Sequence, residues 1–122
     1  MEEERITQAI INFVKGGDNS DVPLLEKVLH PDFRVASNNF MGNPGVKIID
    51  RSAYIANVAA GVFGGLPREM EILLIDENGS IANVKIRLKS AQNNFVSYNS
   101  LVLDIDNEWK LIHNLAIVEA II

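Results

Sequence analysis

The residues best suited to bind a small molecule lie on two consecutive predicted strands near the end of the chain. Ser97 and Asn99 are two positions apart, so their side chains lie on the same face of a strand. On the next strand, the spacing of Trp109, Leu111 and His113 predicts that the histidine shares the face of its two apolar neighbours. An imidazole there can donate a hydrogen bond to a ligand carbonyl or exchange a proton near neutral pH. An apolar lining with a few polar side chains is typical of a small-molecule site.

Tyr54 is a further candidate, since it lies on the apolar face of a helix predicted over residues 52–63. Its hydroxyl points into the cavity, or the ring simply packs in the core; the pattern leaves both open. His30 precedes Pro31 at the end of another predicted helix, and we interpret it as a C-terminal cap. The predicted ligand-binding residues are Tyr54, Ser97, Asn99 and His113.

The sequence predicts no catalytic residue, metal site or cofactor. The acidic residues fall at predicted turns, helix starts or outward-facing positions, except Glu119, which has inward parity and is expected at the rim. Asp50 is interpreted as an N-cap that competes with Ser52 for this role. No carboxylate is expected within hydrogen-bond reach of His113, so the imidazole lacks the partner of an acid–base dyad. The chain has no cysteine, and its two histidines have no acidic motif beside them, so no metal-ligand spacing is recognisable.

The second half of the chain predicts an antiparallel sheet. Strands are expected over residues 69–75, 81–89, 95–105 and 108–121, and the short polar turns between them make successive strands antiparallel neighbours. In residues 81–89 the alternation is almost strict, which is typical of a strand with one buried and one exposed face. The expected buried side chains are Val84, Ile86 and Leu88, and the expected exposed ones are Lys85, Arg87 and Lys89.

The first half is mainly helical by pattern. Helices are expected over residues 2–15, from 21 to about 30, and over 52–63, with short strands at 32–39 and 46–49. The predicted fold class is therefore α+β, with three helices of the N-terminal half packed on a curved, mainly antiparallel sheet of about six strands. The space between helices and sheet is the expected site.

Several segments resemble the putative lumazine-binding branch of the nuclear transport factor 2-like superfamily, which is related to ketosteroid isomerase-like and polyketide cyclase-like proteins. The segments are residues 29–33, 49–55, 95–101 and 106–112. The resemblance covers essentially the whole chain, and it implies a single domain over residues 1–122 shaped as a cone-like half-barrel. The family often has an aspartate where this chain has Ser97 and a lysine where it has Asn114, so one candidate general base is missing here.

The opposite face of the last strands predicts an assembly. With Leu111 inward, an apolar outer face is expected, and a second copy of the chain would cover it. The outward side chains are predicted to be Ile112, Ala116, Val118, Val102 and Tyr98. The resemblance also implies a homodimer through this face.

Composition narrows the classes of partner. The net charge of −5 disfavours binding to phosphate backbones, and three basic residues on one strand are an ordinary solvated face. No apolar run approaches the roughly 20 residues of a membrane-spanning helix, and the acidic start is unlike a leader peptide, so no membrane partner and a cytoplasmic location are expected.

The leading interpretation is a protein that binds a small, largely apolar ligand through a few polar anchors, without catalysis or with weak catalysis. One alternative is an enzyme of the isomerase, cyclase or dehydratase type with His113 as the acid or base. Another is a dimeric structural or interaction module with a vestigial pocket. An open cavity favours the first two interpretations, and a filled one favours the third.

Overall fold

The computed structural model describes residues 2–121. The helices are α1 (Glu2–Asp18), α2 (Val22–Val28) and α3 (Arg51–Ala59), with a short 3-10 turn, η1 (Phe40–Gly42). The strands are β1 (Leu29–Asn38), β2 (Val46–Asp50), β3 (Glu69–Asn78), β4 (Ile81–Lys89), β5 (Asn93–Leu103) and β6 (Trp109–Ala120). The predicted class, α+β with three helices and about six strands, is confirmed.

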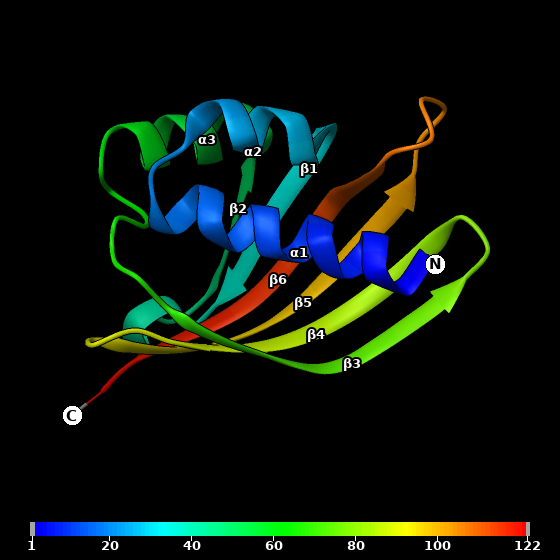
Figure 1. Ribbon diagram of the computed structural model, residues 1–122. Coiled ribbons are helices and arrows are strands. Elements are labelled where there is room, and N and C mark those ends of the chain that lie inside the picture. Colours follow the sequence, from blue (N-terminus) through cyan, green and yellow to red (C-terminus); the bar gives the residue numbers. More distant parts are fainter. Residues whose placement is uncertain (1, 122) are drawn as a thin grey trace.

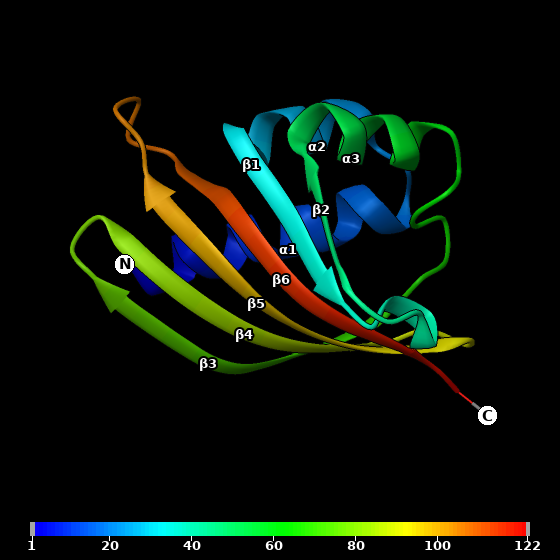
Figure 2. The same cartoon turned by 180° about the vertical axis from the view of Figure 1, so that it is seen from behind.

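The strands form one curved sheet in the order β2-β1-β6-β5-β4-β3, so β2 and β3 are its edges and the sheet does not close. All neighbours are antiparallel except β1 and β6, which are parallel because the chain crosses from one to the other through α3 and four strands. The helices lie over the concave face, with α1 running across the strands (Figure 1). Figure 2 shows from behind that no helix crosses the other face of β3 to β6.

The core forms where α1 meets the sheet. Ile6, Ile10 and Phe13 lie at helical spacing on α1 and are buried against the inward side chains of the strands. The register predicted for residues 81–89 is confirmed: Val84, Ile86 and Leu88 are buried, while Arg87 and Lys89 are exposed and Lys85 is half-buried. One continuous apolar core therefore fixes α1 on the sheet.

A β-bulge in β6 reverses the faces predicted for the second half of that strand. Leu101 pairs with Leu111 but Ser100 pairs with His113, so Ile112 is an extra residue without a partner on β5. Because side chains alternate along a strand, one extra residue moves every later side chain to the other face. His113 thus lies on the outer face, and the prediction that it faces the helices is wrong.

The bulge also changes which side chains form the outer face. Leu115 and Ile117 are exposed, at 45% and 50%. Ala116 and Val118 instead turn toward the helices, and Val118 is only 6% exposed. The predicted outward positions of Ala116 and Val118 are therefore wrong, whereas Tyr98 is exposed as expected.

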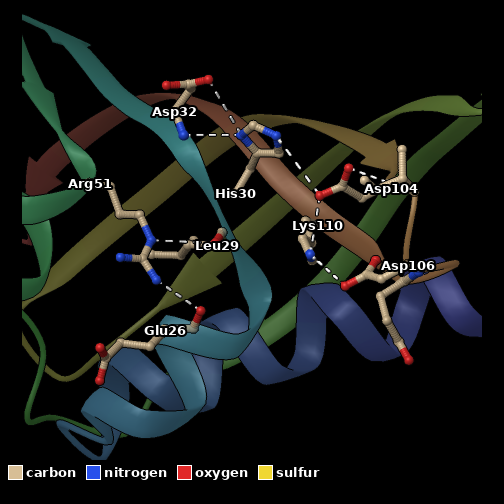
Figure 3. A network of polar contacts seen from close by, with 10 residues as sticks. Glu26, Leu29, His30, Asp32, Arg51, Asp104, Asp106 and Lys110 are labelled. Atoms are coloured by element: carbon tan, nitrogen blue, oxygen red, sulfur yellow. Dashed lines mark hydrogen bonds and ion pairs between the residues drawn. The ribbon is translucent and has the colours of Figure 1, made fainter.

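A polar network links the turn between β5 and β6 to the start of β1 (Figure 3). Lys110 Nζ donates to Asp104 Oδ2 at 3.1 Å and to Asp106 Oδ2 at 2.7 Å. His30 Nδ1 accepts the backbone N–H of Asp32 at 3.0 Å, and its Nε2 lies 3.9 Å from Asp104 Oδ2. The network anchors the β5–β6 turn, which lies at the opposite end of β5 from the β4–β5 turn.

The C-cap residue of α2 is Leu29, and an arginine side chain bonds to carbonyls at this helix end. Strand β1 begins at Leu29, directly after α2, so His30 already belongs to a strand. Arg51 Nη2 donates to the carbonyl of Glu26 at 2.9 Å, and its Nε donates to the carbonyl of Leu29 at 3.4 Å (Figure 3). These bonds satisfy carbonyls that the helix end leaves free. The cap role predicted for His30 is therefore wrong.

No helix in the described part of the chain is both long and apolar enough to cross a membrane. The cytoplasmic location stays a prediction.

Candidate functional site

A cavity of about 520 Å³ lies between the helices and one end of the sheet. Its walls come from the end of α1, from α3, from the segment between α3 and β3, from η1 and from the inward faces of five strands. Figure 1 shows the segment after α3 descending along the side of the molecule to the end of the sheet where η1 and the β4–β5 turn lie. The volume falls within the usual range of small-molecule sites.

A second hollow, of about 400 Å³, lies on the surface of α1. Its lining residues are Glu3, Glu4, Thr7 and Gln8. It is formed by consecutive turns of a single helix, so it lacks the converging elements that position a ligand.

Aromatic rings form the helix side of the cavity. The ring centroid of Tyr54 lies 5.9 Å from that of Phe13, 5.7 Å from that of Phe33 and 6.0 Å from that of Phe63. Such spacings are typical of packed aromatic clusters. Burial raises the pKa of Tyr54 to about 12. Its hydroxyl is protonated at neutral pH, as that of an ordinary tyrosine is, and can donate a hydrogen bond.

The sheet side of the cavity carries a chain of polar side chains. Asn114 Nδ2 donates to Asn99 Oδ1 at 2.6 Å, and Asn99 Nδ2 donates to Ser97 Oγ at 3.2 Å and to the carbonyl of Val84 at 3.3 Å. Ser97 and Asn114 border the cavity, whereas Asn99 has no exposed surface and lies behind them. Asn99 thus positions the two side chains that a ligand can reach.

The bonds to Asn99 determine what these two side chains offer. Asn114 uses an N–H of its amide, and no described residue donates to its Oδ1 atom. Since every fully buried side-chain nitrogen or oxygen in residues 2–121 has a partner, this oxygen must be accessible. Ser97 Oγ accepts a bond from Asn99 and keeps its own proton for another acceptor. This chain of side chains therefore presents one acceptor and one donor to the cavity.

Two basic residues complete the lining. Arg68 Nε donates to Asp18 Oδ1 at 2.5 Å, its backbone N–H donates to Asp18 Oδ2 at 3.2 Å, and its guanidinium lies 5.0 Å from the ring centroid of Phe95. Lys47 lies on the edge strand β2 opposite Ser37, which also borders the cavity. The ion pair ties the segment after α3 to the end of α1.

The structure brings together only part of the predicted site. Tyr54 and Ser97 border the cavity, and Asn99 supports it from behind. His113 lies on the opposite face of the sheet, where it pairs with Ser100 of β5 and Arg34 of β1. The spacing of Trp109, Leu111 and His113 predicted alternating side chains along β6, but it gave no indication of the bulge.

Asn114, Lys47 and Arg68 border the cavity and were missed as site residues. Apart from His113 and Asn114, residues 111–118 are apolar at both alternating positions, so no pattern marked Asn114 as inward. Lys47 follows a turn on a short strand, and Arg68 reaches the site through an ion pair with a residue 50 positions away. The one available signal was the resemblance, which assigns a polar residue to position 114.

Metal binding finds no support in the described residues, where no three His, Cys, Asp or Glu side chains form a group able to hold an ion.

A comparison with models of known protein families gives a match over most of the chain. A sequence model of the family described as putative lumazine-binding matches residues 1–115. No curated protein matches the chain. That residues 1–122 form a single domain remains a prediction.

Solved structures show the same fold at low sequence identity. A nuclear transport factor 2-like protein of unknown function from Silicibacter pomeroyi is 16% identical, with a TM-score of 0.83 over 96% of this chain and 95% of that one. One from Cytophaga hutchinsonii is 19% identical, with a TM-score of 0.80 over 99% of both chains. A ketosteroid isomerase-like protein from Erwinia carotovora atroseptica is 12% identical, with a TM-score of 0.74 over 98% of this chain and 95% of that one.

Proposed function

This chain belongs to the putative lumazine-binding family and has the nuclear transport factor 2-like fold, and on that basis we propose that it binds a small, largely apolar molecule without turning it over rapidly. The proposed ligand contacts are Tyr54, Ser97 and Asn114, with Asn99 as the residue that positions the latter two. The aromatic wall takes the apolar body of the ligand, and the three polar groups fix its orientation.

One observation carries this proposal: the polar groups at the cavity have bonding capacity that the fold does not use. The Asn99 side chain makes three hydrogen bonds that serve only to hold Ser97 and Asn114 and to bond one carbonyl. A buried polar chain costs desolvation, which an apolar side chain in its place would avoid. Its presence beside an open cavity is what a binding site requires.

The two alternative functions have less support. The enzyme interpretation relied on His113, which lies on the other face of the sheet. None of the described residues that border the cavity is an aspartate, a glutamate or a histidine, so the lining lacks the carboxylates and imidazoles that most often serve as general acids and bases. A vestigial pocket would be filled by side chains, whereas this cavity retains about 520 Å³.

Blocking the cavity tests the proposal. Ala116 borders the cavity from β6, so Ala116→Phe places a ring inside it, while Ala56→Phe adds the same ring on the exposed side of α3. The neutral fluorescent probe N-phenyl-1-naphthylamine should bind the wild type and the Ala56 variant and lose affinity at least tenfold in the Ala116 variant. Equal binding by all three proteins would contradict a binding role for the cavity, provided that thermal unfolding shows each variant to be folded.

We also propose that the chain forms a homodimer through the outer face of the sheet. The exposed apolar side chains on this face are Ile48, Tyr98, Leu115 and Ile117, at 61%, 51%, 45% and 50% exposure. They come from β2, β5 and β6, and no helix within residues 2–121 covers them (Figure 2). An apolar area that spans several strands is unusual on a monomer, and a two-fold contact would cover it with an identical area.

A further inference from the structure

The charge of the cavity is opposite in sign to that of the chain. The protein carries a net charge of −5. The cavity is bordered by Lys47 and Arg68, and no carboxylate is among the described residues of its lining. A ligand in the cavity therefore meets a positive local field although the surrounding protein is acidic.

Of the two cations, Lys47 is the one that remains uncompensated. The charge of Arg68 is balanced by Asp18, whose carboxylate lies 2.5 Å from its Nε atom. Lys47 forms no salt bridge with any residue between positions 2 and 121. Lys110, by contrast, pairs with two aspartates. The Lys47 ammonium is thus free to pair with an anion that enters the cavity.

The strand register directs Lys47 toward the cavity. Lys47 pairs with Ser37 of β1, and Ser37 pairs with Ala116 of β6. Directly paired residues share a face of the sheet, and both Ser37 and Ala116 border the cavity. The neighbours of Lys47 on β2, Val46 and Ile48, are exposed on the other face at 66% and 61%. Lys47 and Ile49 are therefore the inward residues of β2, and Lys47 is exposed at the rim of the cavity.

The neutral polar groups of the lining suit polar ligand atoms of either kind. The hydroxyls of Tyr54 and Ser97 can donate, and Asn114 Oδ1 is an accessible acceptor. Ser37, Gln92 and Asn93 also border the cavity, and their side chains can both donate and accept. The charge of Lys47 is therefore the feature of the lining that selects between classes of ligand.

We propose that the cavity binds an amphipathic organic anion, whose apolar ring system lies against the aromatic wall and whose carboxylate or comparable anionic group pairs with Lys47. This inference rests on the proposed binding function and adds the chemical class of the ligand. The apolar body accounts for the rings of Phe13, Tyr54, Phe63 and Phe95, and the anion accounts for the lysine without a partner.

Two probes of the same shape test the class of ligand. The compound 8-anilinonaphthalene-1-sulfonate carries the ring system of N-phenyl-1-naphthylamine together with one anionic group. Lys47→Met removes the ammonium and keeps an apolar side chain, and Lys27→Met is the control on the exposed side of α2. Affinities are measured by fluorescence titration, and any signal that persists in Ala116→Phe is subtracted as binding outside the cavity.

Lys47→Met should weaken binding of the sulfonate about three- to tenfold, the range for a charge pair at the partly exposed rim of a site. Binding of the neutral probe should change less than twofold, and Lys27→Met should change neither affinity. Raising NaCl from 50 to 500 mM should weaken sulfonate binding in the wild type but not in Lys47→Met, because salt screens the charge pair.

The outcomes separate this inference from the proposed function. If both probes bind in the cavity and Lys47→Met affects them equally or not at all, the anion class is wrong while the binding function stands. If Ala116→Phe weakens the binding of neither probe, the proposed binding function itself fails.

Discussion

Replacing Asn99 by leucine tests the polar chain on which the candidate site depends. Leucine has a similar size and cannot form hydrogen bonds. The substitution removes the bond accepted from Asn114 at 2.6 Å and the two bonds donated to Ser97 and Val84 at 3.2 and 3.3 Å. It leaves the Asn114 amide without its partner beside the cavity.

The expected cost follows from the burial of these groups. Leaving a buried polar group unpaired costs about 1–3 kcal/mol. Asn114 borders the cavity, so water can replace part of the lost bond, and the expected loss for Asn99→Leu lies in the lower half of this range, about 1–2 kcal/mol. For a chain of 122 residues this corresponds to a decrease in Tm of about 3–8 °C.

The assay is urea unfolding of a double-mutant cycle. In Asn99→Leu/Asn114→Leu both partners are apolar, so the double variant should be about 1 kcal/mol more stable than the sum of the single effects predicts. Asn94→Leu, at an exposed position of β5, is the control and should change the free energy of unfolding by less than about 0.5 kcal/mol. Additive single effects would refute the view that Asn99 and Asn114 act as a bonded pair.

Three further predictions address the rest of the molecule. Leu115→Asp should yield monomers in sedimentation velocity and retain probe binding. Val118→Asp should abolish probe binding, because Leu115 and Val118 lie on opposite faces of β6. A wild-type protein that is monomeric at micromolar concentration would argue against the dimer. The hydrogen bond that the Trp109 indole donates to Glu2 lowers the pKa of Glu2. The ionised carboxylate of Glu2 therefore stabilises the fold above the pKa of the unfolded state, and this contribution is lost as pH falls below about 4. Thermal unfolding between pH 3 and 7 should show a smaller acid-induced loss of stability for Glu2→Gln than for the wild type. Gly64→Ala should lower the unfolding free energy more than Gly65→Ala, since both have positive φ, at +72° and +81°, but only at position 64 does an added Cβ meet a backbone oxygen, at 2.0 Å; equal losses in urea unfolding would mean that this backbone contact relaxes freely.

The fold could be predicted from the sequence because its elements are marked locally. The alternation over residues 81–89 has charged side chains on one face only, so just one register is possible and the structure has it. Of the two predicted cap residues, Asp50 rather than Ser52 caps α3, with its carboxylate accepting the N–H of Ala53 at 2.9 Å. Each of these features depends on residues close together in the chain.

The site could be predicted only in part, because its decisive features depend on contacts between distant segments. Arg68 borders the cavity because Asp18, 50 positions earlier, holds it there. The bulge at Ile112 arises where β6 must pair with β5 on one side and with β1 on the other, and the β1–β6 register also shifts, between Leu29 and Arg34. The sequence of β6 alone contains no pattern that indicates its pairing with β5 or with β1.

The bulge connects the cavity and the outer face of the sheet. With unbroken alternation, His113 would face the helices and Asn114 would face solvent. The extra residue instead brings Asn114 into line with Asn99, where its amide completes the polar chain beside the cavity. The same shift places Leu115 and Ile117 on the outer face, where they extend the exposed apolar area toward Tyr98. One irregularity in one strand therefore determines both the polar groups offered to a ligand and the surface offered to a second copy, and this is why the two proposals depend on the same register.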